Sequence, residues 1–83
     1  MATRNVSVRD NRFDPQDIPV KVGDTVLWTR VGHHIHTVTA DNGDFDSGDL
    51  GPGQQFSQTF QTAGVVYYHC EHHDGMTGTV TVT

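Results

Sequence analysis

The chain has 83 residues, a formal charge of -5 at pH 7 and a single cysteine. We expect one domain over residues 1–83 with a modest core, because folding buries only about 60% of the surface of so short a chain. The five Lys and Arg residues are scattered, which argues against nucleic-acid binding. One cysteine cannot form an intramolecular disulfide, and the longest apolar run, residues 65–68, is far too short to span a membrane.

Three segments in the first half of the chain alternate apolar and polar residues, as half-buried strands do: residues 5–9, 18–22 and 25–29. In the second of them Ile18, Val20 and Val22 share one face, and Pro19 restricts the segment to a sheet edge. The Gly23-Asp24 pair that follows predicts a tight hairpin.

The second half of the chain shows further strand patterns, over residues 36–40, 56–60, 65–70 and 79–83. Between them, residues 41–53 are rich in Asp and Gly and predict a loop, with Phe45 and Leu50 as its apolar anchors. The aspartates of this loop lack the order and closing Glu of an EF-hand, so a solvated acidic loop is favoured over calcium binding. Seven or so short strands without a helical period predict an all-β antiparallel sandwich or barrel.

Residues 67–76, with the sequence YYHCEHHDGM, contain the strongest chemical signal. Cys70, His73 and Met76 recur at intervals of three and offer a thiolate, an imidazole and a thioether. These are soft ligands, which select copper over calcium, magnesium or manganese. Strand alternation directs the Cys70 sulfur to the same face as Val66 and Tyr68, and therefore into the sandwich.

The fourth ligand has to come from elsewhere in the chain, and His36 in the segment HHIHTV is the best candidate. His36 shares its face with Val38, whereas His33 and His34 belong to the preceding turn. Two imidazoles and a thiolate with a distant axial thioether form a blue-copper electron-transfer site. With every coordination position filled by protein, no open catalytic position remains, so we do not expect an enzyme.

Three segments make the chain resemble the cupredoxins of the plastocyanin type: FDPQDIPVKVGDTVLWT, HTVTADNGDFDSGDLGPGQQFSQTF and YYHCEHHDGMTGTVTV. The short interval from His73 to Met76 is similar to the ligand loops of amicyanin and pseudoazurin. This resemblance implies a Greek-key β-sandwich of about seven to eight strands with one copper ion near one end, cycling between Cu(I) and Cu(II). Carried over by position, the ligands are His36, Cys70, His73 and Met76, which leaves His72 as a solvated neighbour.

The chain also departs from these relatives at several positions. Many of them have Asn directly after the first ligand histidine, where it braces the ligand loop. This chain has Thr37, so the brace is either absent or supplied by a hydroxyl. Residues 71–75 lack the Pro that relatives often have in this loop, and His69 stands where plastocyanins have an exposed Tyr.

The expected function is the transfer of single electrons between redox-partner proteins by a monomer. The resemblance implies an exported protein, periplasmic or extracellular, although the chain shows no signal peptide. The alternatives are a domain of a larger copper oxidoreductase, a copper storage or delivery module, and an interaction domain that binds zinc or no metal. The remaining histidines would be the argument for storage, but surface solvation is their default role: His33, His34, His69 and His72.

Overall fold

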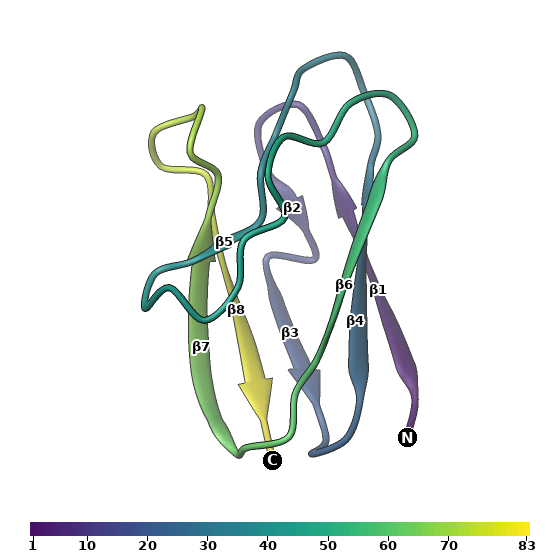
Figure 1. Ribbon diagram of the computed structural model, residues 1–83, viewed down its shortest axis with the longest axis vertical. Coiled ribbons are helices and arrows are strands. Elements are labelled where there is room, and N and C mark those ends of the chain that lie inside the picture. The colour runs from purple at the N-terminus through teal and green to yellow at the C-terminus, as the bar shows by residue number, and fades with distance from the viewer.

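The computed structural model describes residues 1–83 as two four-stranded sheets packed face to face (Figure 1). The eight strands are β1 (Thr3–Val8), β2 (Phe13–Asp14), β3 (Asp17–Val20), β4 (Thr25–Arg30), β5 (Thr39–Ala40), β6 (Gln55–Thr59), β7 (Gly64–His69) and β8 (Thr77–Val82). One sheet has the order β2-β1-β4-β6 and the other the order β3-β8-β7-β5. The predicted all-β sandwich is therefore confirmed. The structure has no helix that could cross a membrane.

Both sheets are mixed, and the expectation of purely antiparallel pairing was wrong. Strand β1 runs parallel to β4, and β3 runs parallel to β8. The predicted hairpin at Gly23-Asp24 was also wrong, because β3 and β4 belong to different sheets and this turn crosses between them. Crossing lets the apolar faces of both strands cover the same core from opposite sides, which a hairpin within one sheet would not do.

The core lies between the two sheets and follows the alternation seen in the sequence. Trp28 is completely buried and packs edge-to-face against Tyr68, with 5.3 Å between the ring centroids. Strand β3 lies at a sheet edge, as Pro19 predicted. Val22, expected to share the buried face of Val20, is instead 47% exposed, because the strand ends at Val20 and the chain then turns toward the other sheet.

Tyr68 lies directly opposite Gly78 in the antiparallel pair of β7 and β8. A Cβ atom at residue 78 would overlap the Tyr68 ring, so only glycine leaves room for this side chain. Burial raises the pKa of Tyr68 to about 12, and the phenol stays neutral at any physiological pH. Tyr68 stands two residues before Cys70, so its close packing against Gly78 fixes the end of β7 that leads to Cys70.

The strand expected over residues 36–40 is shorter in the structure, where β5 comprises Thr39–Ala40 alone. His36 instead forms an isolated antiparallel bridge with Leu50. Phe45 and Leu50 are both buried, so the predicted anchors of the long loop are confirmed. The loop thereby lies along the segment that contains His36.

Candidate metal centre

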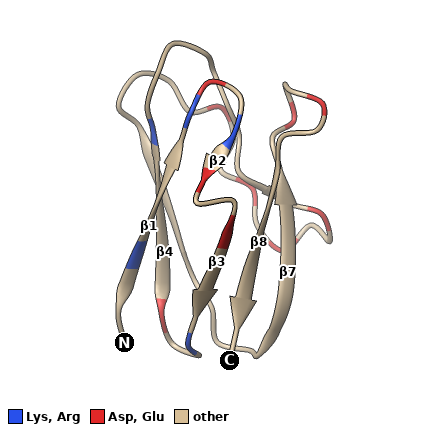
Figure 2. Ribbon diagram, turned by 180° about the vertical axis from the view of Figure 1, so that it is seen from behind, with Lys and Arg blue, Asp and Glu red and all other residues tan.

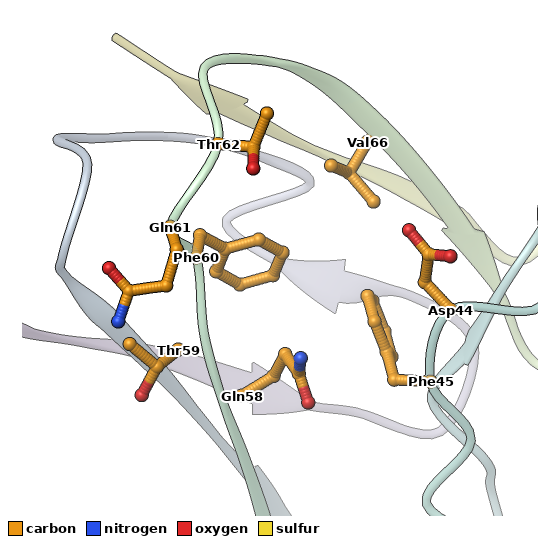
Figure 3. A pocket seen from close by; sticks show the side chains of 8 residues that line it. All are labelled: Asp44, Phe45, Gln58, Thr59, Phe60, Gln61, Thr62 and Val66. Atoms are coloured by element: carbon orange, nitrogen blue, oxygen red, sulfur yellow. The ribbon is translucent and has the colours of Figure 1, made fainter.

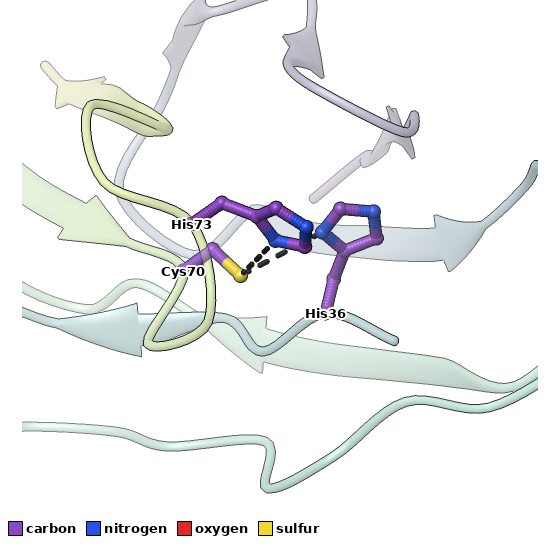
Figure 4. A group of neighbouring side chains, drawn as sticks. All are labelled: His36, Cys70 and His73. Carbon is purple, nitrogen blue, oxygen red and sulfur yellow. Dashed lines mark hydrogen bonds between the residues drawn. The ribbon is translucent and has the colours of Figure 1, made fainter. Parts of the chain in front are cut away.

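His36, Cys70 and His73 form one cluster at the end of the sandwich (Figure 4). His36 lies between β4 and β5, Cys70 follows β7 directly, and His73 lies in the turn between β7 and β8. The Cys70 Sγ atom is 3.6 Å from Nδ1 of His36 and 3.4 Å from Nδ1 of His73. Both imidazoles therefore direct the same ring nitrogen toward one sulfur, although 34 residues separate His36 from Cys70.

Backbone hydrogen bonds close the turn that follows β7. The Cys70 N–H donates to the Met76 carbonyl at 3.0 Å, and the Met76 N–H donates to the His73 carbonyl at 3.3 Å. Cys70 and Met76 are both buried, whereas His73 is half-buried. The three residues spaced at intervals of three thus belong to one compact turn, and Met76 ends it immediately before β8.

The His36 side chain is fully buried, and a hydrogen bond fixes the backbone of the same residue. The Leu50 N–H donates to the His36 carbonyl at 2.7 Å, and the ring Nε2 has no hydrogen-bond partner. Burial lowers the pKa of His36, and the neighbouring His73 lowers it further. The ring is therefore neutral at pH 7, with a free lone pair, which is the form that binds a metal ion.

The donor atoms have the spacing that one shared metal ion requires. Bonds of about 2.0–2.3 Å from imidazole and thiolate to a common ion place the donors about 3.5 Å apart. The two N–S distances of 3.4 and 3.6 Å match this spacing, and all three donors lie within 4.8 Å of one another. Since thiolate and imidazole are soft or borderline ligands, the cluster fits a single copper ion.

Thr37 connects the His36 segment to the turn after Cys70 through its hydroxyl. The Glu71 N–H donates to Thr37 Oγ1 at 2.9 Å, so the hydroxyl supplies the brace that the sequence left open. Thr37 and Thr39 hydroxyls are 3.0 Å apart, and Thr39 donates to the Asp46 carboxylate at 3.1 Å. The carboxylate can only accept, so the chain of donors runs from Glu71 through Thr37 and Thr39 to Asp46.

Sequence reasoning did not identify Asp46 or Asp10 as residues that support the cluster. Asp46 was interpreted as part of a solvated loop. Asp10 accepts hydrogen bonds from the backbone N–H groups of His33 at 2.7 Å and His34 at 3.3 Å, and so holds the turn before His36. These bonds hold the pKa of Asp10 below its usual range. The only signal in the sequence is that both residues are Asp, which commonly caps backbone N–H groups in turns.

The four remaining histidines lie at the surface and form no second group of three metal-binding side chains. His69 Nδ1 is 2.5 Å from Asp41, and its Nε2 is 3.3 Å from Glu71. The hydrogen bond to Asp41 raises the pKa of His69, so the two carboxylates favour its protonated form. His72 pairs with Asp49 at 2.7 Å, while His33 and His34 are exposed.

Charge is distributed unevenly over the molecule (Figure 2). All Lys and Arg residues lie within residues 1–30, and residues 31–83 contain acidic residues without any basic one. The acidic side chains of the second part lie in the loop after β5 and in the turn after β7. A separate shallow hollow of about 190 Å³ lies beside β6, lined by Phe45, Phe60 and Val66 among others, and contains none of the clustered residues (Figure 3).

Comparison with known proteins agrees with this geometry. A family model described as copper binding proteins of the plastocyanin/azurin family matches residues 2–83. Plastocyanin of Scenedesmus fuscus is 34% identical, over 84% of this chain and 85% of that protein. Amicyanin of Paracoccus denitrificans is also 34% identical, over 93% of this chain but only 63% of its own length.

Solved structures show the same fold. A purple cupredoxin from Nitrosopumilus maritimus superimposes with a TM-score of 0.87 at 26% identity, covering 96% of this chain and 99% of that one. An oxidised mutant of amicyanin superimposes with a TM-score of 0.89 at 29% identity, covering 96% of this chain and 81% of that one. The chain is a cupredoxin and belongs to the plastocyanin/azurin family of copper-binding proteins.

Proposed function

We propose that this protein is a type 1 copper electron carrier whose metal would be held by His36, Cys70, His73 and Met76. The observation that carries the proposal is the convergence of one sulfur and two Nδ1 atoms at 3.4 and 3.6 Å. Copper, when bound, supplies a one-electron couple between Cu(II) and Cu(I). The ordered set of His, Cys, His and Met is typical of blue-copper proteins and of no common zinc site.

The protein itself would hold the ligands in one arrangement and keep water from His36 and Cys70. His36 and Cys70 are buried, the turn that contains His73 is closed by backbone hydrogen bonds, and Thr37 ties the two segments together. A frame of this kind limits movement of the ligands when the metal changes charge. His73 is half-buried, and its ring is the proposed route by which an electron enters or leaves.

Several further properties follow from the proposal. The carrier would act as a single domain and a monomer, would exchange electrons with protein donors and acceptors, and would catalyse no reaction of its own. An exported location, periplasmic or extracellular, is part of the proposal. Membership of a larger copper oxidoreductase and a role in copper storage or delivery are the competing functions.

The visible absorption spectrum of the copper-loaded protein tests the proposal. We expect an intense thiolate-to-copper band, its loss in Cys70→Ser, and a bleached or shifted band in His36→Ala, because each removes a proposed ligand. His33→Ala is the matched control, since this exposed imidazole lies outside the cluster and should leave the spectrum unchanged.

Two results would contradict the proposal. A copper-loaded native protein without the intense band would argue for storage or for another metal. A native spectrum in His36→Ala would show that the upstream ligand is a different residue.

A further inference from the structure

Arg30, the last residue of β4, is a buried charge without an acidic partner. Its residue exposure is 5%, and no Asp or Glu oxygen lies within 4.0 Å of its guanidinium. Arginine is almost never buried in this way unless it is paired, because removing its charge from water costs several kcal/mol. An unpaired buried arginine in so small a core therefore points to a specific role.

The guanidinium donates to backbone carbonyls on both sides of His36. Its Nη1 donates to the Gly32 carbonyl at 2.7 Å, and its Nε donates to the Gly51 carbonyl at 3.0 Å. Gly32 lies in the turn that leads to His36, and Gly51 directly follows Leu50, whose N–H bonds to the His36 carbonyl. Arg30 thus joins the two segments that pair with each other at His36.

We propose that Arg30 positions His36 and raises the reduction potential of the metal centre through its unpaired charge. The proposal rests on the proposed function. With one thiolate and neutral imidazoles, the centre carries one positive charge as Cu(II) and none as Cu(I). A nearby cation repels the oxidised form and leaves the reduced form almost unaffected. The protein interior screens this repulsion less than water does.

An anion lies on the same turn as one of the carbonyls that Arg30 contacts. Asp10 accepts hydrogen bonds from the backbone N–H groups of His33 at 2.7 Å and His34 at 3.3 Å, next to Gly32. The charge beside the His36 segment is thus set by a buried cation against a half-buried anion.

The test compares Arg30→Met with Arg30→Lys in the full chain, using voltammetry of the copper-loaded proteins. Methionine removes the charge, whereas lysine keeps it and loses the forked geometry. We expect Arg30→Met to bind Cu(II) about tenfold more tightly relative to Cu(I), which corresponds to a potential about 59 mV lower. Arg30→Lys should stay close to the native potential. Arg4→Met removes an exposed arginine near the opposite end of the β1–β4 pair, and it should not change the potential.

The positioning role has its own measurement, the melting temperature of the metal-free protein. Both Arg30 variants should melt lower than the native chain, because each loses a hydrogen bond to Gly32 or Gly51. If Arg30→Met does not fold, Arg30→Gln, which keeps an amide donor, replaces it in the same comparison.

The proposal is overturned if Arg30→Met keeps the native potential, or if Arg30→Lys shifts as far as Arg30→Met. If both metal-free variants melt at the same temperature as the metal-free native protein, the positioning role is overturned. A native protein without the thiolate-to-copper band would instead refute the proposed function, so the two failures are distinguishable.

Discussion

At the scale of single residues, a threonine hydroxyl braces the turn that contains three of the proposed ligands. Thr37 accepts a hydrogen bond from the Glu71 N–H and donates one to the Thr39 hydroxyl, which donates to Asp46. Each bond polarises the next, and the carboxylate at the end fixes the direction of all of them. The brace therefore links the buried cluster to an aspartate in the exposed loop.

Replacing Thr37 with Val tests this brace, because valine has nearly the same shape but cannot accept a hydrogen bond. The Glu71 N–H would lose its partner, and we expect the metal-free protein to lose about 1 kcal/mol of unfolding free energy. Urea unfolding of the metal-free protein measures the change. Asp46→Asn is the matched control, since its amide oxygen still accepts from Thr39 and the loss should be smaller. Equal stability of Thr37→Val and the native chain would contradict the brace.

At the scale of elements, Asp24 anchors the crossing from β3 to β4. Its carboxylate accepts from the Ala2 N–H at 2.8 Å and the Lys21 N–H at 2.9 Å, and Arg4 lies 3.9 Å away. The hydrogen bond from Lys21, followed by that from Ala2, holds the pKa of Asp24 below its ordinary value of 3.8. One side chain thus ties the start of β1 to the turn between the two sheets.

The lowered pKa of Asp24 predicts a dependence of stability on acidity. A carboxyl whose pKa is lower in the folded chain stabilises the fold above its unfolded pKa, and this contribution is lost as pH falls through the folded pKa. Asp24→Asn should therefore be less stable than the native chain at pH 7, and the gap should shrink as the pH falls below about 4. Urea unfolding of the metal-free proteins at pH 7 and pH 3 measures it.

Asp44→Asn serves as the control for Asp24→Asn, because Asp44 is exposed and bonds only to neighbouring Asn42. Its stability should differ little from native at either pH. A gap between Asp24→Asn and the native chain that is the same at pH 7 and pH 3 would show that the ionised carboxylate is not what anchors the turn.

At the scale of the whole molecule, the proposed metal centre would join segments that no disulfide connects. His36 precedes β5 and Cys70 follows β7. The hydrophobic core between the sheets is small, because the chain has only 83 residues. Metal that binds only the folded chain stabilises it, by about 4 kcal/mol when free metal exceeds the dissociation constant a thousandfold. For a chain of this size that corresponds to a melting temperature roughly 15–30 °C higher.

Calorimetry of the metal-free and copper-loaded proteins measures this gain. Cys70→Ser should show a much smaller rise on addition of copper, because it lacks the proposed thiolate ligand. Equal melting temperatures for the native protein with and without copper would mean that copper does not bind at the folded cluster.

The sequence by itself predicted much of this protein correctly. Alternation identified the buried faces of β1, β4, β7 and β8, because burial of apolar side chains imposes a period of two on a strand. Phe45 and Leu50 were recognised as anchors because they are apolar residues in a loop rich in Asp and Gly. The short intervals between Cys70, His73 and Met76 were enough to predict a set of metal ligands, since residues in one turn lie close together in any fold.

Only the tertiary structure decided which strands pair and which distant groups support the cluster. Alternation shows which face of β3 is buried but not that β8 is its partner, so the parallel pairs and the crossing at Asp24 were not predictable. The hydrogen bonds from Thr39 to the Asp46 carboxylate and from Arg30 to the Gly32 carbonyl join positions that only folding brings together. Such bonds leave no period or spacing in a sequence, because a backbone carbonyl is the same at every residue and a loop aspartate stands at no fixed interval from its partner.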